Sequence, residues 1–134
     1  MTTQSNAIIK QWLDDLAFSA ATWDLEAHMA LISTRVEVIG IPGVAKIDYQ
    51  GWKRRRNNEF KKKLLHSLHY RKPVIVSEGS QSITFSVLEV MKDHTKQCIE
   101  LEKIVTLHRE EDQRWRVVHE QIINIDIKRV CATA

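Results

Sequence analysis

Two stretches decide the fold of this chain: Trp23–Val38 (W-D-L-E-A-H-M-A-L-I-S-T-R-V-E-V) near its start and Trp115–Gln121 (W-R-V-V-H-E-Q) near its end. The first predicts a short helix that runs directly into a strand, because helical spacing of its apolar residues gives way to alternation. The second predicts a closing strand with Trp115 and His119 on one face, since side chains two positions apart in a strand point to the same side. Together they indicate a small cone-shaped fold that encloses a pocket.

The residues around the first stretch predict two further helices. Apolar residues recur every three or four positions from Ile8 to Ala20, which is typical of an amphipathic helix, and Asn6 is a suitable N-cap. The turn signal Ile41-Pro42-Gly43 then ends the first strand. A third helix is expected over about residues 49–65, with only a narrow apolar stripe.

Beyond residue 68 the apolar pattern changes to period two, which is typical of strands. Polar turn segments divide this half of the chain into four predicted strands, at about residues 68–77, 81–92, 98–109 and 114–125. Helices followed by a meander of antiparallel strands predict an α+β fold with the helices on one face of a sheet. Neither a linker nor an internal repeat interrupts the pattern, so one domain over residues 1–134 is expected.

The composition indicates a globular protein rather than a disordered chain, with 43% hydrophobic and 28% charged residues among 134. No apolar run approaches the roughly 20 residues that a membrane span needs, and the polar start lacks the order of a secretory signal. A cytoplasmic protein is therefore expected, with Cys98 and Cys131 as reduced thiols. No spacing of histidines and cysteines fits a metal site, and neither a metal nor another cofactor is expected.

Three motifs carry a resemblance to a known superfamily: Asp24–Ala27 followed by Val36–Val38, the turn Ser77–Ser80, and the strand Arg114–Glu120. They resemble the nuclear-transport-factor-2-like superfamily, which includes SnoaL-like and ketosteroid-isomerase-like proteins, over about residues 8–123. The resemblance implies three N-terminal helices against a strongly curved, mainly antiparallel sheet, an apolar conical cavity with a few polar groups, and a homodimer. Its members include isomerases, dehydratases and cyclases as well as non-catalytic modules, so the fold alone does not choose an activity.

The resemblance allows one activity to be tested. Ketosteroid isomerase chemistry requires a carboxylate base, together with a tyrosine and a protonated acid that stabilise the enolate. The matching positions fall at or near Gly40 for the base, Val105 for the acid, and Leu16 or Trp12 for the tyrosine. None of these residues has the required group, which predicts that the chain is not a ketosteroid isomerase.

Three residues on the predicted strands are candidates for acid–base chemistry. His119 lies on the closing strand, where the resemblance implies a side chain that faces the cavity. Glu89 and Lys103 interrupt apolar faces of neighbouring strands, and a hairpin centred on His94-Thr95 makes them diagonal neighbours. The pair has two interpretations: mutual neutralisation, or a charged pair inside the cavity that holds an acid or moves a proton.

The sequence of the last turn does not decide which face of the sheet His119 occupies. A four-residue loop at 110–113 places His119 opposite Ile104 and Lys103 opposite Glu120. The alternative register places His119 opposite Lys103 but sets Glu102 against Glu120, and this contact between like charges disfavours it.

The residues expected to bind a ligand are aromatic or lie at positions that the resemblance directs toward the cavity. They are Trp12, Leu16, Trp52, His69, Tyr70, Val105, Trp115 and Gln121. The aromatic members have a competing interpretation as plain core residues, because aromatic side chains at helical spacing usually belong to the core.

The net charge of +3 is unevenly distributed. Residues 53–72 hold nine basic residues against Glu59 alone, so this stretch carries +8 and the remainder −5. Such a basic helix attracts nucleic acid and other polyanions. The favoured interpretation is a solvated face balanced by the acidic remainder or by a dimer mate, and no membrane partner is expected.

The sequence therefore predicts a homodimeric protein that holds a small apolar or amphipathic ligand in a conical cavity. Two classes remain open: a cofactor-independent acid–base enzyme of isomerase, dehydratase or cyclase type, and a non-catalytic binding or assembly module. The outer face expected to form the dimer carries the mixed row Ser82, Thr84, Ser86, Leu88 and Val90, extended by Ile123, Ile125 and Ile127.

Overall fold

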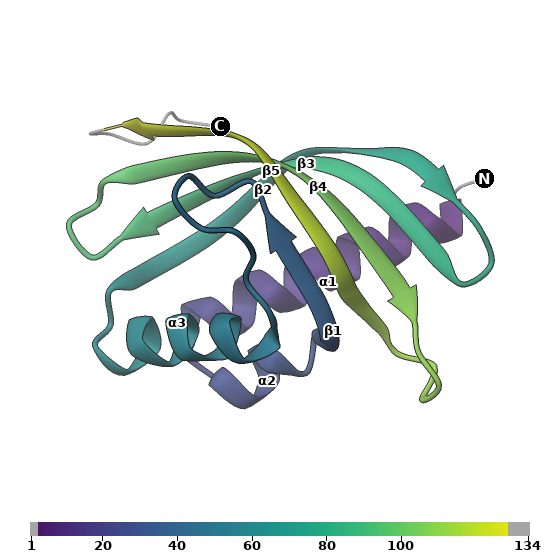
Figure 1. Cartoon of the computed structure of the whole chain (residues 1–134), viewed down its shortest axis with the longest axis horizontal. Helices are drawn as coiled ribbons and strands as arrows, with labels where there is room; N and C mark the ends of the chain where they lie inside the picture. The colour runs from purple at the N-terminus through teal and green to yellow at the C-terminus, as the bar shows by residue number, and fades with distance from the viewer. Residues whose placement is uncertain (1–2, 129–134) are drawn as a thin grey trace.

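The computed structural model describes residues 3–128, which form three helices and one five-stranded sheet (Figure 1). The helices are α1 (Thr3–Ala21), α2 (Leu25–Met29) and α3 (Tyr49–Lys61). The strands are β1 (Ile32–Ile39), β2 (Leu65–Glu78), β3 (Ser82–Asp93), β4 (Cys98–Arg109) and β5 (Trp115–Lys128). In the sheet they lie in the order β1-β5-β4-β3-β2, with β1 parallel to β5 and every other pair antiparallel.

The expected α+β class and the meander of four long strands are confirmed, but the three helices are not one N-terminal group. β1 separates α2 from α3, because the chain crosses from the helical layer into the sheet and back before the meander begins. Asp24 caps α2 and Asp48 caps α3, each by accepting a hydrogen bond from a backbone N–H of the first turn. α3 ends at Lys61 rather than at the expected residue 65, because β2 already begins at Leu65.

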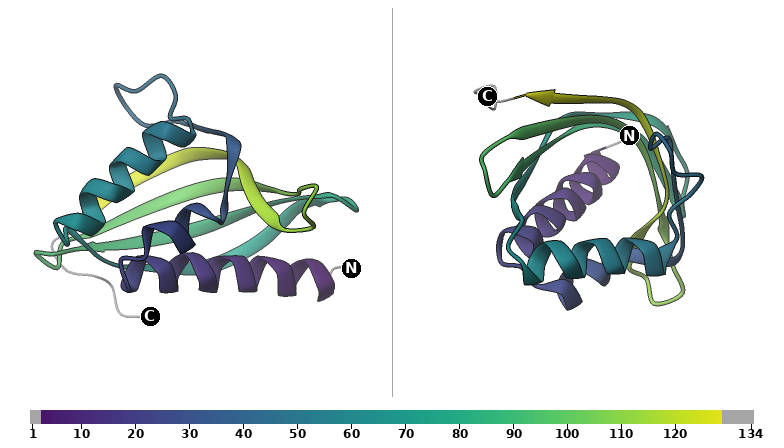
Figure 2. Two further views of the ribbon diagram at one scale, coloured as in Figure 1. Left: turned by 90° about the horizontal axis from the view of Figure 1, so that it is seen from below. Right: turned by 60° about the vertical axis from the view of Figure 1, so that its left-hand side comes forward.

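The sheet is strongly curved and wraps around the helices (Figure 2). Register shifts interrupt the pairing of β2 with β3 at three places and that of β4 with β5 at two, and such bulges bend a strand and increase its twist. Gly40, just past β1, sits against the bend of β5. It has φ +96°, and a Cβ added to it would lie 2.1 Å from the carbonyl oxygen of Ile122.

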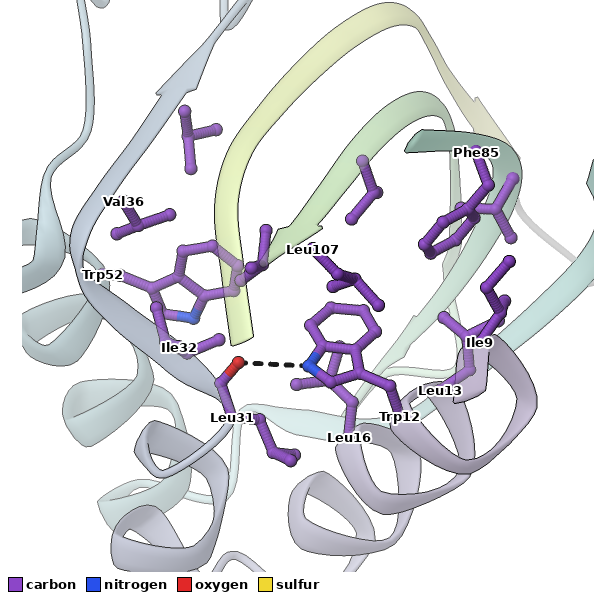
Figure 3. Packing of buried hydrophobic residues seen from close by; sticks show 14 of the residues in the cluster. Ile9, Trp12, Leu13, Leu16, Leu31, Ile32, Val36, Trp52, Phe85 and Leu107 are labelled. Atoms are coloured by element: carbon purple, nitrogen blue, oxygen red, sulfur yellow. Dashed lines mark hydrogen bonds between the residues drawn. The ribbon is translucent and has the colours of Figure 1, made fainter. Parts of the chain in front are cut away.

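The main core fills the space between α1 and the concave face of the sheet (Figure 3). Trp12 packs edge-on against Phe85, with ring centroids 6.5 Å apart, and its Nε1 donates a hydrogen bond to the carbonyl oxygen of Leu31 at 3.1 Å. Leu16, Leu107 and Phe85 are almost completely buried in the same cluster. The indole of Trp12 is thus both core and a tie between α1 and the start of β1.

Neither expected register of the last hairpin is correct. Arg109 pairs with Trp115, and a bulge on β5, in which Val118 is the extra residue opposite Thr106 and Leu107, places His119 opposite Thr106. Because Val117 stays opposite the buried Leu107, the bulge sends Val117 and His119 to opposite faces. The expectation that Trp115 and His119 share a face is wrong for this reason.

The outer face of the sheet carries four members of the expected half-buried row, Ser82, Thr84, Ser86 and Leu88, but the fifth, Val90, is buried. Ile125 and Ile127, which were expected to extend it, instead pair with Leu101 and Ile99 and line a pocket on the concave side. Their placement follows from a second bulge on β5, in which Ile123 is the extra residue opposite Glu102 and Lys103. The homodimer stays a prediction.

Cys98 is fully buried and disulfide-bonded, so the expectation of a reduced thiol is wrong there. Cys131 lies outside the described residues. Within residues 3–128, no helix has both the length and the apolar character that a membrane crossing requires.

Removing the ring that Trp12 packs against tests the core. Phe85→Ala is expected to lower the free energy of unfolding by about 3–5 kcal/mol, because a large buried side chain leaves a cavity. Phe18→Ala is the matched control, since Phe18 is 70% exposed and its loss should change stability by less than about 0.5 kcal/mol. Denaturant unfolding of both variants measures the difference, and equal effects would contradict the assigned core.

Candidate functional site

A row of polar side chains crosses four strands on the concave face of the sheet. Tyr70 Oη donates a hydrogen bond to Glu89 Oε2 at 2.7 Å. Lys103 Nζ lies 3.0 Å from Glu89 Oε2 and 3.0 Å from Glu120 Oε1. The two carboxylates and the ammonium group are each no more than 6% exposed, so three charged groups are removed from water together.

Strand pairing explains why these side chains meet. Tyr70 is paired with Glu89, and Val87 is paired with Lys103, so Glu89 and Lys103 are diagonal neighbours on one face, as expected from the sequence. On the other side of Lys103, Glu120 is paired with Val105 and therefore points to the same face. The alternation of side chains along β3 and β4 places Glu89 and Lys103 on the interior face.

The neighbouring charges outweigh the effect of burial on the pKa values of Glu89 and Lys103. Burial alone would raise the pKa of Glu89, but Lys103, Arg56 and the hydrogen bond from Tyr70 hold that pKa below its ordinary value. Burial would likewise lower the pKa of Lys103, but Glu120 and Glu89 hold it above its ordinary value. Burial and the adjacent Glu89 raise the pKa of Tyr70 well above its ordinary value, so the phenol keeps its proton and remains a donor.

Arg56 approaches this row from α3. Its Nε donates to His28 Nε2 at 3.2 Å, and its Nη1 donates to Glu59 Oε1 at 2.7 Å. The guanidinium carbon lies 6.0 Å from the centre of the Trp52 ring. These contacts fix a buried guanidinium close enough to Glu89 to lower the pKa of that carboxyl.

His28 is a neutral anchor for Arg56. Its imidazole is completely buried, and burial together with the charges of Arg56 and Lys103 lowers its pKa to about 2. Because Nε2 accepts from Arg56, the ring proton is on Nδ1 and donates to Ser19 Oγ at 2.9 Å. Ser19 Oγ in turn donates to the carbonyl oxygen of Leu16 at 2.9 Å, which completes a chain of hydrogen bonds from α1 to α3.

The row forms the charged end of a pocket with a volume of about 300 Å³. Charged residues of the row and of α3 line one part of it, and apolar residues line the rest. The apolar lining is Val38, Ile41, Ile47, Trp52, Met91, Ile99, Leu101, Ile122, Ile125 and Ile127. Two buried polar atoms among the described lining residues have no hydrogen-bond partner: Glu89 Oε1 and Trp52 Nε1.

The structure brings four of the expected site residues together. Glu89, Lys103 and Trp52 line the pocket, and Tyr70 is hydrogen-bonded to Glu89 from the α1 side. Three others, Trp12, Leu16 and Val105, are core residues that do not line it.

The remaining expected residues lie elsewhere. His119 is half-buried opposite Thr106, on the face opposite to that of Glu120, and Gln121 is exposed opposite Ile104. His69 is exposed beside α1, and Trp115 lines a separate surface hollow next to Trp12. His119 is therefore not close to Lys103 and Glu89 on the concave face.

Sequence reasoning missed Glu120, Arg56 and His28. A signal for Arg56 exists, because Trp52, Arg56 and Phe60 are spaced four apart and share the buried stripe of α3. The neighbouring basic residues Lys53, Arg54, Arg55 and Lys61 are exposed, as expected for a solvated face. Glu120 appeared opposite Lys103 in one expected register, but only the observed bulges show which face it occupies.

The fold itself is known from other proteins. A protein described as "Putative Scytalone Dehydratase" from Novosphingobium aromaticivorans matches with TM-score 0.74 and 12% identity, over 97% of this chain and 90% of the other. A nuclear-transport-factor-2-like protein from Cytophaga hutchinsonii matches with TM-score 0.70 and 12% identity, over 91% and 98% of the two chains. LinA matches with TM-score 0.66 and 12% identity, over 97% and 92%.

The chain therefore has the nuclear-transport-factor-2-like fold. No family model matches the sequence. No curated protein matches it either. At such low identities structural likeness establishes the fold alone, and the chemistry has to be argued from the site.

The central role of Lys103 is tested by removing its charge. Lys103→Met leaves Glu89 and Glu120 buried without their shared cation, and the free energy of unfolding at pH 7 is expected to fall by about 3–5 kcal/mol. The deficit should narrow as the pH falls from 7, because burial without a cation raises the pKa of the carboxylates in the variant and their protonation relieves the repulsion. In the wild type the pKa of Glu89 is lowered, so the ionised carboxylate stabilises the folded state above the unfolded-state pKa. This stabilisation is lost on acidification, so the free energy of unfolding of the wild type falls.

Lys46→Met is the matched control for this titration. Lys46 pairs with Glu37 at 3.4 Å with both side chains about half exposed, so its loss should cost less than about 1 kcal/mol. Denaturant unfolding at a series of pH values compares the two variants. A Lys103→Met protein as stable as the control at pH 7 would refute the buried row.

Proposed function

We propose that the protein binds a small amphipathic ligand in the pocket at the charged row. The observation that carries this proposal is the pocket's composition: a wall of apolar side chains leads to buried Glu89, Lys103, Glu120 and Arg56. Binding sites for small molecules commonly combine an apolar lining with a few convergent polar groups in a volume of about 300–1,000 Å³. The cavity's volume of about 300 Å³ lies at the lower end of that range.

The unpartnered oxygen of Glu89 supports binding over a purely structural role for the row. A structural ion-pair cluster is stable when every buried polar atom has a partner, because each unsatisfied atom loses its contact with water without compensation. Glu89 Oε1 is buried and has no partner among the described residues, although Glu89 lines the pocket. A polar group on a ligand would supply the missing hydrogen bond.

A pair of isoleucines on β5 provides the test of binding. Ile125→Trp narrows the pocket that Ile125 lines, whereas Ile123→Trp changes a residue that is 55% exposed and does not line it. The wild type and the Ile123 variant are expected to bind the apolar dye Nile red with similar affinity, and the Ile125 variant at least about tenfold more weakly, a difference of about 1.4 kcal/mol. Native mass spectrometry of protein purified without added ligand shows whether a cellular molecule is retained.

Equal dye binding by all three proteins would show that the dye binds elsewhere. Absence of both dye binding and a retained molecule in the wild type would refute the pocket as a ligand site.

Acid–base catalysis is a second candidate function, and the geometry favours Glu89 over His119 as the base. Glu89 is held ionised and has one oxygen without a partner, while Lys103 and Arg56 place positive charge beside it. Fixed positive charge beside a carboxylate lowers its basicity, but it stabilises the anion that forms when the carboxylate removes a proton. His119, on the outer face, does not reach this pocket.

Deuterium exchange tests proton abstraction directly. The bicyclic ketone 2-tetralone has acidic C–H groups, and the protein in D₂O is expected to accelerate their exchange as followed by NMR. Glu89→Gln should reduce the protein-dependent rate by about 100-fold or more, as is typical for loss of a general base. Glu102→Gln, an exposed change on β4, should leave the rate unchanged. Equal rates in all three proteins would exclude Glu89 as the base.

A further inference from the structure

We infer that the polar group of the ligand is uncharged and both donates and accepts hydrogen bonds, as a hydroxyl group does. The inference rests on the proposed function of the pocket and concerns what that pocket selects. It follows from the unpartnered atoms at the charged end, from the balance of charge there, and from the apolar walls.

Glu89 determines that the ligand donates a hydrogen bond. Its Oε2 already accepts a hydrogen bond from Tyr70 Oη at 2.7 Å and lies 3.0 Å from Lys103 Nζ. Its Oε1 is buried and has no partner among the described residues. An ionised carboxylate only accepts hydrogen bonds, so a ligand atom that meets Oε1 has to carry a proton. A second carboxylate or an ether oxygen does not satisfy this requirement.

Two groups determine that the ligand also accepts. Trp52 lines the pocket, and its Nε1–H is buried without a partner among the described residues. Arg56 also lines the pocket, where its Nε donates to His28 and its Nη1 donates to Glu59. Indole and guanidinium nitrogens only donate, so a hydroxyl oxygen near them would serve as acceptor.

The charge of the site argues against an ionic ligand. Three acidic side chains (Glu59, Glu89 and Glu120) and three basic side chains (Arg55, Arg56 and Lys103) line the pocket, so its charges balance. A carboxylate or an ammonium group on the ligand would therefore add a net charge to a desolvated site that is already balanced, which is unfavourable. An uncharged hydroxyl keeps the balance.

The apolar walls fit the rest of such a molecule. Leu101 and Ile122 are nearly buried next to the charged end, and Ile99, Ile125 and Ile127 continue the lining outward along β4 and β5. The site thus favours a compact hydrocarbon skeleton with one hydroxyl group at its inner end.

A set of four naphthalene compounds with one varied substituent tests the inference on the intact chain. The compounds are naphthalene, 2-naphthol, 2-naphthoate and 2-naphthylmethylammonium, and their affinities are measured by displacement of Nile red at pH 7. 2-Naphthol is expected to bind about tenfold or more tightly than each of the other three, since it alone satisfies donor and acceptor without adding charge.

Glu89→Gln tests whether the selectivity comes from the charge of the row. The amide keeps the shape of the side chain but leaves the buried end with net positive charge. The affinity of 2-naphthoate is therefore expected to rise about tenfold relative to that of 2-naphthol. Glu102→Gln removes the same charge from the exposed side of β4 and is expected to keep the wild-type order. Circular dichroism establishes that both variants are folded.

The outcomes separate this inference from the proposed function. If the wild type neither binds Nile red nor retains a cellular molecule, the proposed function fails. If Nile red binds in the pocket but 2-naphthol does not displace it, the pocket binds ligands but the hydroxyl preference is wrong. If naphthalene, 2-naphthoate or the ammonium compound binds as tightly as 2-naphthol, the pocket binds ligands but the hydroxyl preference is wrong. The wild-type comparison decides this even if Glu89→Gln does not fold.

Discussion

Lys103 lies between two buried carboxylates, and this contact constrains much of the structure around it. Three charged groups at the interior of a sheet are tolerated only if they remain in contact, because a buried charge without its partner is strongly destabilising. Glu89, Lys103 and Glu120 come from three neighbouring strands, so their contact fixes the relative register of β3, β4 and β5. The same contact keeps Glu89 ionised at the end of the pocket.

The helical side of the site completes this arrangement. Arg56 is directed inward from a helix whose other basic residues are exposed, and a neutral His28 holds its Nε in place. A protonated His28 would repel Arg56, so the very low pKa of the imidazole is a condition for the guanidinium to remain there. The ligand-facing charge of the pocket is therefore set by contacts that extend through α3 and α2 to Ser19 on α1.

Much of the fold was predictable from the sequence, whereas only part of the site was. Periodicity placed the long strands within a few residues, and the hairpin between β3 and β4, which has no bulge, gave the Glu89–Lys103 contact correctly. The next hairpin contains two bulges that no sequence pattern revealed, and each shifts the alternation by one residue. That shift removed His119 from the concave face and directed Ile125 and Ile127 toward it. Arg56 was overlooked because its basic neighbours suggested a uniformly solvated face.

The ionisation of Glu89 is the central claim, since the pocket's selectivity and its capacity for proton abstraction both depend on it. Carbon-13 NMR titration of glutamate-labelled protein measures it directly, with the Glu89 side-chain carboxyl signal assigned by its absence from the Glu89→Gln spectrum. The structure predicts that this signal titrates below the ordinary range of a glutamate, about pH 4.3, and is that of a carboxylate at pH 7. A Glu89 signal that titrates near or above neutral pH would contradict the account.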